Sequence, residues 1–289
     1  MPKKLILVLG PTASGKTDYS ISLAENYGSP IISCDSRQIY KEMKIGTAPP
    51  SPEQLERVKH YFIFSHSIHS SYTAGKYETE AIALLDDLFK RHDTIVAAGG
   101  SGLYVHALCY GLDDFPPADI QLRRSLKERL DREGIESLQN QLKIVDQESY
   151  ETIEIENSRR VLRALEVTIQ TGRKYSSFKT GYERVRPFTI EKRMITRSRE
   201  ELYSRINRRV DMMFEAGLLE EAKLLYNFRE LPALKTVGYS ELFSHLEGKI
   251  SLDEAKELIK RNTRRYAKRQ ITWWNRYDDM LTVNMKETD

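Results

Sequence analysis

An octapeptide near the start of the chain has the residue types and spacing of a phosphate-binding loop. Residues 10–17 read Gly-Pro-Thr-Ala-Ser-Gly-Lys-Thr and match the pattern G-x-x-x-x-G-K-[ST]. In this pattern the glycines let backbone N–H groups turn toward a phosphate, the lysine reaches the terminal phosphates, and the threonine hydroxyl can ligate Mg²⁺. We therefore expect a phosphate-binding loop, called the P-loop below, made of Gly10, Pro11, Thr12, Ala13, Ser14, Gly15, Lys16 and Thr17.

The segments around the P-loop predict the elements that must position it. Five apolar residues, Leu5–Leu9, predict a buried strand before the loop, and the pattern of Asp18–Asn26 predicts a helix after it. Further strands are predicted at Ile31–Cys34 and Thr94–Ala98, and a helix at about 75–91. This alternation of strands and helices favours an α/β fold with a doubly wound parallel sheet, in which ligands bind at the carboxyl ends of the strands.

A carboxylate is missing where a nucleotide-hydrolysing enzyme usually has one. Such enzymes hold Mg²⁺ through an acidic residue that ends a second buried strand, but Thr94–Ala98 is followed by Gly-Gly-Ser-Gly. The strand that does end in a carboxylate is Ile31–Cys34, which is followed by Asp35. In a doubly wound sheet Asp35 lies at the same edge as the P-loop, so we expect it to face the bound ligand.

The chain changes character at Asp113–Asp119, a proline-containing segment with the composition of a linker. Amphipathic patterns predict three helices beyond it, at Arg123–Glu133, Ile135–Lys143 and Ser158–Thr171. Capping boxes that begin at Ser198 and Ser251 predict two more long helices. We therefore expect a P-loop, doubly wound parallel sheet core formed by 1–119 and 191–289, with a helical insertion at 120–190.

Basic residues are concentrated in three clusters. They are Arg159, Arg160 and Arg163; Arg193, Arg197, Arg199, Arg205, Arg208 and Arg209; and eight Lys or Arg residues between Lys256 and Arg276, with Glu257 as the one acid among them. A single cluster is typical of a solvated helix face. Three clusters in a chain that also carries a P-loop favour a polyanionic partner.

Composition excludes a membrane-spanning protein, since no apolar run approaches the roughly 18 residues that a spanning helix needs. Residues Met1–Lys4 lead directly into the first predicted strand, so we expect no signal peptide. Cys34 and Cys109 lack the spacing of a metal site or a disulfide framework, which favours a reducing compartment. We expect a cytoplasmic protein that acts as a monomer.

Several blocks of the chain together resemble the tRNA dimethylallyltransferase family. Besides the P-loop, they are Asp35–Gln38, Gly99–Tyr104, Arg159–Glu166, Val237–Tyr239 and Tyr266–Trp273. The blocks occur in the family's order and cover nearly the whole chain, which makes them far more specific than a P-loop alone. Ser101 stands where the family commonly has threonine, and this difference keeps the hydroxyl group.

The resemblance implies transfer of a dimethylallyl group from its diphosphate to N6 of the adenosine immediately 3′ of the anticodon (position 37), in tRNAs reading codons that begin with U. It also implies a Mg²⁺ requirement and an insertion that grips the anticodon arm. Lys16, the loop amides, Mg²⁺ and an arginine can stabilise the departing diphosphate, to which Thr17 can donate a hydrogen bond. Arg209 and Arg205 are both candidates for that arginine, because both fit the family pattern R-[IV]-x-x-R-V-x-x-M. Asp35 is our candidate for the general base that takes the N6 proton.

The adenosine must leave its stack to reach such a site, because bases of single-stranded loops are read by extrusion and stacking. The residues implied to contact tRNA are Asp35, Ser36, Arg37, Gln38, Ser101, Arg123, Arg159, Arg160, Val161, Leu162, Arg163, Lys268 and Arg269. We expect Tyr266, Trp273 and Trp274 to be packed core, because aromatic residues at near-helical spacing usually are. His60, His66 and His69 show no metal spacing.

Two other classes of protein share the P-loop. A P-loop kinase of a small metabolite would explain Gly10–Thr17 but not the basic helices or the block Lys268–Trp273. An RNA-binding NTPase that uses ATP as a switch would also explain the loop, and both alternatives require ATP turnover or tight ATP binding. A relative that prenylates free adenine nucleotides is closer in chemistry, but it would not need three basic clusters.

Overall fold

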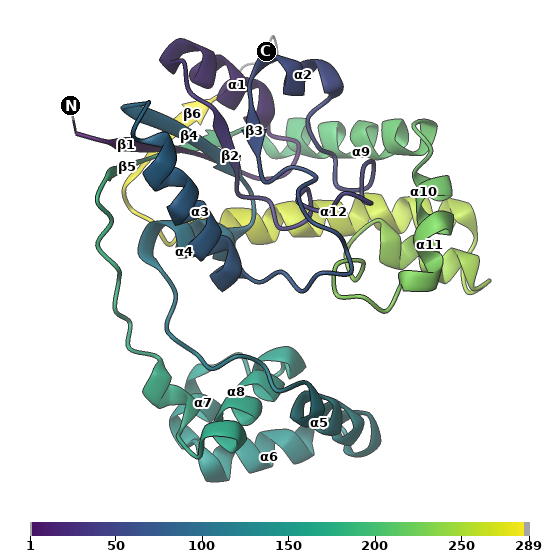
Figure 1. The fold of residues 1–289 in the computed structure, drawn as a ribbon. Coiled ribbons are helices and arrows are strands. Elements are labelled where there is room, and N and C mark those ends of the chain that lie inside the picture. The colour runs from purple at the N-terminus through teal and green to yellow at the C-terminus, as the bar shows by residue number, and fades with distance from the viewer. Residues whose placement is uncertain (1, 286–289) are drawn as a thin grey trace. The chain divides into compact units, whose positions relative to one another are not determined.

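The computed structural model describes residues 2–285, which form a six-stranded parallel sheet with helices around it (Figure 1). The strands are β1 (Lys4–Leu9), β2 (Ile31–Ser33), β3 (His60–Tyr61), β4 (Thr94–Gly99), β5 (Thr189–Thr196) and β6 (Met280–Asn284). Their order in the sheet is β3-β2-β4-β1-β5-β6, and every neighbouring pair is parallel. The predicted doubly wound α/β fold is confirmed, and β3 at one edge and β5 and β6 at the other extend the sheet beyond the strands that the sequence patterns predicted.

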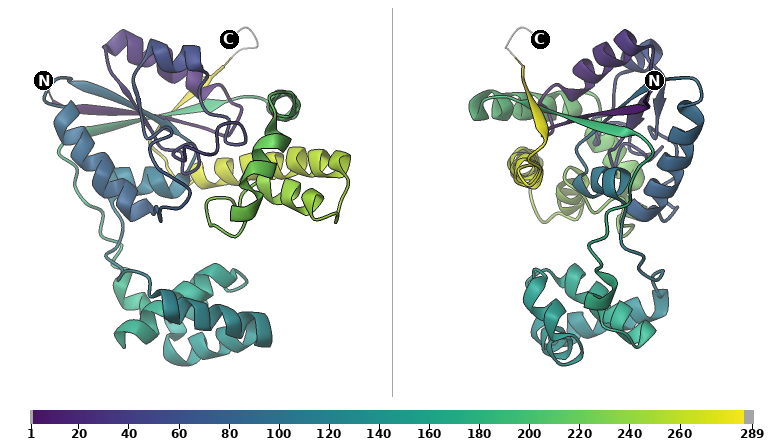
Figure 2. Two further views of the ribbon diagram at one scale, coloured as in Figure 1. Left: turned by 45° about the vertical axis from the view of Figure 1, so that its right-hand side comes forward. Right: turned by 90° about the vertical axis from the view of Figure 1, so that its left-hand side faces the viewer.

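Helices cover both faces of the sheet. Helices α1 (Lys16–Tyr27) and α2 (Pro52–Arg57) lie on one face, and α3 (Ala74–Leu88) and α4 (Gly102–Tyr110) lie on the other (Figures 1 and 2). Every residue of Leu5–Leu9 is fully buried, because alternate side chains of β1 pack toward opposite helical layers. Burial on both faces explains why this strand reads as a continuous apolar run.

The helices that follow β5 in the chain extend the core. They are α9 (Arg199–Glu215), α10 (Leu218–Leu225), the short η2 (Tyr226–Phe228), α11 (Tyr239–Leu246) and α12 (Leu252–Trp274). Ser251 closes the predicted capping box with Glu254 at the start of α12, and Ser198 accepts a hydrogen bond from the Glu201 N–H at the start of α9. Within residues 2–285, no helix combines the length and the apolar content that crossing a membrane requires.

The second compact unit, Leu112–Arg184, is helical and has its own hydrophobic core. Its elements are α5 (Ile120–Glu133), α6 (Ile135–Val145), α7 (Gln147–Thr152), α8 (Ser158–Thr171) and η1 (Tyr175–Phe178). Helix α5 begins three residues before the predicted position because the Asp119 carboxylate accepts hydrogen bonds from the N–H groups of Gln121 and Leu122, at 2.9 and 3.0 Å. We refer to this unit as the helical unit.

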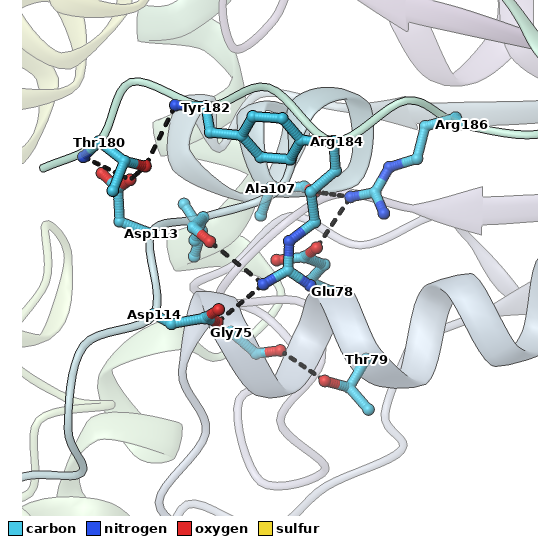
Figure 3. A network of polar contacts seen from close by, with 11 residues as sticks. Gly75, Glu78, Thr79, Ala107, Asp113, Asp114, Thr180, Tyr182, Arg184 and Arg186 are labelled. Atoms are coloured by element: carbon cyan, nitrogen blue, oxygen red, sulfur yellow. Dashed lines mark hydrogen bonds and ion pairs between the residues drawn. The ribbon is translucent and has the colours of Figure 1, made fainter. Parts of the chain in front are cut away.

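The helical unit includes linker residues that we expected to belong to the core, so its ends lie before 120 and 190. Asp113 accepts hydrogen bonds from the backbone and hydroxyl of Thr180, and Arg184 pairs with Asp114 at 2.7 Å (Figure 3). These contacts tie the two connecting segments to each other. Arg186, the next arginine along the chain, belongs to the core, where it pairs with Glu78 of α3 at 2.9 Å.

Candidate active site

The P-loop connects the carboxyl end of β1 to α1 and curls around its own lysine. Gly10 has φ +148°, and a Cβ there would lie 2.8 Å from the Ile195 carbonyl oxygen of β5, so only glycine fits this approach. Lys16 Nζ donates a hydrogen bond to the Pro11 carbonyl at 2.7 Å. The lysine is therefore held across the mouth of the loop, where a phosphate bound by the loop amides would meet it.

Three arginines surround the P-loop and play two different parts. Arg197 donates to the Ser14 carbonyl at 2.8 Å and pairs with Glu201, and Arg205 donates to the Ala13 carbonyl at 2.9 Å. Both therefore brace the backbone of the loop. Arg209 instead reaches the Thr12 hydroxyl at 3.1 Å, and no carboxylate within residues 2–285 forms an ion pair with it. Its guanidinium is thus the more available of the two candidates for an incoming anion.

Positive charge accumulates at the P-loop with little compensation. Burial, followed by the nearby Arg209 cation, lowers the pKa of Lys16 to about 7, and Asp35 offsets only part of this shift. Burial and the Arg205 cation likewise lower the pKa of Arg209. Lys16 and Arg209 are thus cations whose pKa values are lowered by burial and by a neighbouring cation. An anionic ligand beside them would offset both effects and favour the protonated lysine.

Asp35 lies in a tight turn after β2, with one carboxylate oxygen fixed by the backbone. Oδ1 accepts hydrogen bonds from the N–H groups of Arg37 at 2.8 Å and Gln38 at 3.2 Å. Oδ2 has no hydrogen-bond partner among residues 2–285. Ser101, from the turn after β4, supports the same segment, because its hydroxyl accepts from the Ser36 N–H at 2.9 Å and donates to the Ser36 hydroxyl at 3.0 Å. The turn therefore presents one oriented oxygen that can accept a proton.

Helix α12 supplies two site residues that sequence reasoning did not place there. Gln270 is buried, accepts a hydrogen bond from the Thr12 N–H at 2.8 Å, and donates to the Gly100 carbonyl at 2.9 Å. Tyr266, one turn earlier, lines the cavity, where burial and the Asp35 carboxylate raise its pKa to about 12. The sequence signal that could have placed them together is their four-residue spacing, which puts Tyr266 and Gln270 on the same face of a helix.

The prediction that the three aromatic residues of α12 are packed core is therefore wrong for Tyr266. It is confirmed for Trp274, which is fully buried. Trp273 is half-buried, with its indole against the backbone of Gly102 and the Arg276 guanidinium 4.2 Å from its ring centre. Helix α12 thus buries Trp274, while Trp273 is half-buried and Tyr266 lines the cavity.

A cavity of about 430 Å³ brings these groups together. Along α9 its lining changes from Arg205 and Arg209 to Val210 and Met213, and along α12 from Gln270 and Tyr266 to Ile259. The cavity thus joins a cationic end at the P-loop to an apolar end. This arrangement suits a ligand that carries an anionic group on a short apolar chain.

His60, His66 and His69 do not belong to any metal centre within residues 2–285. His60 lines the cavity, but its Nδ1 lies 2.8 Å from the Val58 carbonyl and burial lowers its pKa. His66 pairs with Glu80 at 3.5 Å. In the described part of the chain, no three His, Cys, Asp or Glu side chains are placed to hold a metal ion together.

The spacing of Arg159, Arg160 and Arg163 predicts a row of arginines that projects outward from α8, and the structure does not form this row. Arg159 and Arg160 are exposed, but Arg163 donates to the Pro116 carbonyl at 2.6 Å and lies 3.3 Å from the buried Glu166 carboxylate. Arg123 of α5 also pairs with Glu166, at 2.6 Å. Glu166 therefore pairs with two of the predicted tRNA contacts, and its pair with Arg123 joins α5 to α8.

The four-residue spacing of Val161, Leu165 and Ile169 predicts an apolar stripe that packs α8 on a core. Val161 and Leu165 are buried as this spacing predicts, whereas Ile169 is 43% exposed. Ala164 and Thr168 are buried instead, since the stripe follows the 3.6-residue period around the helix rather than a strict four-residue step. Because the Val161 side chain is fully buried, it is not available for the tRNA contact that the resemblance implied. Leu162 is half-buried against the same core.

The basic residues of α12 contrast with those of α8. Arg261, Arg265, Lys268 and Arg269 are exposed, and no carboxylate within residues 2–285 pairs with any of them. Lys256 and Lys260, nearer the start of the helix, are both paired with Asp211, at 2.9 and 3.0 Å. The exposed residues therefore leave a basic surface on the part of α12 that carries Tyr266 and Gln270.

The parallel sheet carries a P-loop with positively charged side chains that suit an anion, and a carboxylate lines the same cavity. These features define the core of a P-loop α/β enzyme. The IPP transferase family model matches residues 38–277. The chain is 48% identical over 278 residues to tRNA dimethylallyltransferase 1 of Bacteroides fragilis, covering 96% of this chain and 92% of that one. It is 46% identical to tRNA dimethylallyltransferase 1 of Phocaeicola vulgatus over 281 residues, covering 97% and 94%. The chain belongs to the tRNA dimethylallyltransferase family of transferases.

Solved structures agree with this assignment. The tRNA isopentenylpyrophosphate transferase of Bacillus halodurans superposes with a TM-score of 0.72 at 35% identity, covering 99% of this chain and 91% of that one. A eukaryotic dimethylallyltransferase acting on tRNA superposes with a TM-score of 0.83 at 26% identity, covering 99% and 75%. The resemblance inferred from the sequence blocks is therefore confirmed over nearly the whole chain.

Proposed function

We propose that this protein transfers a dimethylallyl group from dimethylallyl diphosphate to N6 of adenosine 37 in tRNAs that read codons beginning with U, and releases diphosphate. The observation that carries the proposal is one cavity in which the P-loop cations face the free oxygen of Asp35. A leaving group and a proton acceptor on facing walls are what alkylation of a weakly nucleophilic amine requires.

The leaving group is the diphosphate, and the P-loop end of the cavity stabilises it. As the allylic C–O bond breaks, its electron pair goes to the diphosphate, and the loop amides, Lys16 and Arg209 lie where this charge develops. Thr17 at the start of α1 donates a hydrogen bond to the departing oxygen. We assign Arg205 to positioning, since its Nε holds the Ala13 carbonyl of the loop.

The amine reacts at the opposite wall. The N6 lone pair forms the new N–C bond to the allyl carbon while the C–O bond breaks, and the N6 proton passes to Asp35 Oδ2. The two amide hydrogen bonds to Oδ1 keep the other oxygen pointing at the amine. The turn after β2 is held to Ser101 by the Ser36–Ser101 hydrogen bonds. We assign the contacts with the adenine on this side to Ser36, Arg37, Gln38 and Ser101.

The residues present fit a magnesium ion that is bound mainly through the substrate. Mg²⁺ keeps several waters and takes one or two protein ligands beside substrate phosphates, so the Thr17 hydroxyl suffices without an acidic cluster. When bound, the ion would neutralise charge on the diphosphate. Lys16 and Arg209 supply the remaining positive charge from the protein itself.

Residues of each unit are proposed to contact tRNA. We assign phosphate contacts to Arg159 and Arg160 of the helical unit and to Lys268 and Arg269 of α12, which are exposed. We assign Arg163 and Arg123 to shaping the surface of the helical unit through Glu166, with Arg123 retaining an exposed edge. In this proposal the helical unit, corresponding to the predicted insertion at 120–190, grips the anticodon arm, and the protein acts as a cytoplasmic monomer.

The test is incubation of the protein with unmodified tRNA, Mg²⁺ and labelled dimethylallyl diphosphate, with ATP and free adenine nucleotides supplied separately. We expect label on the tRNA, loss of transfer in Lys16→Ala and Thr17→Ala, and no tRNA-stimulated ATP hydrolysis. ATP turnover that the same two substitutions abolish, without prenyl transfer, would instead establish a kinase or an ATP switch. Labelling of free adenine nucleotides rather than tRNA would overturn the proposed acceptor.

A further inference from the structure

A buried carboxylate outside the reaction described above holds a loop that forms one wall of the cavity. Glu221 of α10 is 9% exposed and accepts hydrogen bonds from three consecutive N–H groups, those of Lys44, Ile45 and Gly46, at 2.7, 2.8 and 2.9 Å. Within residues 2–285, no lysine or arginine pairs with it. A buried carboxylate that accepts from three backbone amides fixes that backbone tightly, because each missing bond would leave the carboxylate undersolvated.

Tyr239 completes this arrangement from α11. Its hydroxyl donates to the Glu221 carboxylate at 2.6 Å, and its ring is fully buried. A Cβ on Gly46 would lie 2.6 Å from the Tyr239 ring, so the loop backbone rests directly on the phenol. Burial and the neighbouring Glu221 raise the pKa of Tyr239, which keeps the hydroxyl a hydrogen-bond donor. We call Glu221 and Tyr239 the latch.

The loop held by the latch leads to the proposed general base. Residues Gly46–Pro50 line the cavity. The Gln38 side chain donates to the carbonyls of Thr47 at 3.3 Å and Ala48 at 2.9 Å. The backbone N–H of the same glutamine donates to Asp35 Oδ1 at 3.2 Å. The latch is thus connected to the Asp35 carboxylate in three steps: its hydrogen bonds to the N–H groups of 44–46, the backbone of the loop, and the hydrogen bonds of Gln38.

We propose that Glu221 and Tyr239 are positioning residues that set the orientation of Asp35 by fixing the loop at 44–50 against Gln38. This inference rests on the proposed function of Asp35. Neither latch residue lines the cavity, and the hydrogen bonds of the latch go to the loop at 44–46 rather than to the P-loop. The latch therefore acts on the amine side of the reaction and leaves diphosphate binding alone. Small displacements of a reacting group lower rates steeply, which is why a remote hydroxyl can matter.

The test uses Tyr239→Phe, which removes one hydroxyl and keeps the packed ring, and Glu221→Gln as the second variant. We expect single-turnover transfer from enzyme saturated with both substrates to fall about 10-fold, with the dissociation constant for dimethylallyl diphosphate unchanged. Tyr226→Phe is the matched control, because Tyr226 lies next to α10 but outside the latch. We expect this control to transfer at the wild-type rate.

Two further measurements separate positioning from a general loss of stability. In an Asp35→Asn background, Tyr239→Phe should cause no further loss of rate, because the group that it orients is absent. An equal loss in both backgrounds, or an unchanged rate in Tyr239→Phe at saturation, would overturn the proposal. Faster hydrogen exchange at the amides of Lys44, Ile45 and Gly46 in Tyr239→Phe is expected even without substrates. If the wild type fails to prenylate tRNA while this exchange effect is present, the proposed function fails and the latch itself stands.

Discussion

The cavity of the core and helix α8 of the helical unit use the same residue type in opposite ways. Arg209 is half-buried and donates a hydrogen bond to the Thr12 hydroxyl, whereas Arg163 has an ion pair with Glu166 and a hydrogen bond to the Pro116 carbonyl. Burial and the Arg205 cation lower the pKa of Arg209, Asp18 offsets only part of the shift, and no carboxylate of residues 2–285 forms an ion pair with the guanidinium. A cation in this condition indicates a ligand site, and a cation beside a buried carboxylate indicates a structural contact.

The charged side chains of the two regions also differ in their exposure to solvent. In the proposed function each charge inside the cavity faces a defined ligand atom in a low-dielectric setting, so its removal should change the chemical step strongly. The charges on α8 and α12 are screened by water and salt and are proposed to act together on tRNA, so each should contribute a little to affinity. Substitutions in the two regions should therefore differ in both the size and the kind of their effect.

The largest effect is expected at Asp35. Asp35→Asn removes the proton acceptor while keeping the shape of the turn, and we expect single-turnover transfer to fall by roughly 10²–10⁴. The tRNA dissociation constant should change little. Asp86→Asn on the exposed side of α3 is the control. Near-normal transfer by Asp35→Asn would show that another group takes the proton.

The next effect distinguishes the two arginines of α9. Arg209→Ala should lower transfer by about 10²–10³, because it removes a cation aimed at the developing charge of the leaving group. Arg205→Ala should cost much less, since its contact is with the loop backbone. Single-turnover rates at saturating substrate make the comparison. A larger loss in Arg205→Ala would reverse the two assignments.

A smaller effect concerns pH. Lys16 has a pKa of about 7 in the ligand-free protein, so it is protonated below pH 7 and loses its proton as pH rises above that value. In the proposed function the charged form of Lys16 binds the diphosphate. The dissociation constant of dimethylallyl diphosphate should therefore increase above pH 7, by at most about 10-fold per pH unit. Calorimetry from pH 6 to 9 measures this. Lys16→Arg should flatten the profile because arginine stays charged, and identical profiles would contradict the prediction.

The smallest effects are expected for the surface cations. Lys268→Ala or Arg269→Ala should weaken tRNA binding and reduce the slope of log K against log[salt] by about 0.7–1 each, as should Arg159→Ala and Arg160→Ala. Arg163→Ala should instead lower the melting temperature, because it leaves Glu166 with one partner fewer. Salt titrations and thermal melts separate the two outcomes. An unchanged melting temperature with a reduced slope in Arg163→Ala would return this residue to the tRNA surface.

The parts of the molecule that the sequence predicted are those set by neighbours in the chain. The P-loop, the strand before it and the capping box at Ser251 follow from local spacing and backbone preferences. The placement of Asp35 beside the P-loop was also predictable, because parallel strands meet at one edge of the sheet. Helix α8 was predicted with its observed bounds, since its apolar residues recur with a helical period.

Strand β5 was missed because its sequence does not look like a buried strand. It carries Glu191, Lys192 and Arg193, yet Lys192 is 3% exposed. The lysine lies over the rings of Tyr110 and Tyr277, and Asp279 accepts from its Nζ at 2.5 Å. A charged residue can be buried in a strand only when such partners arrive from distant segments, and no local pattern announces them.

The sequence by itself determined the chemistry that is available: a loop for a phosphate, a carboxylate at a neighbouring strand end, and an excess of basic helices. Only the tertiary structure decided which of those groups remain available to a ligand. It assigned Arg163 to Glu166 and left Arg209 facing the cavity, and it brought Gln270 to a P-loop that is 258 residues away in sequence. The physical reason is that a charge or amide is defined by its residue type, whereas its partner is defined by packing between elements that are remote along the chain.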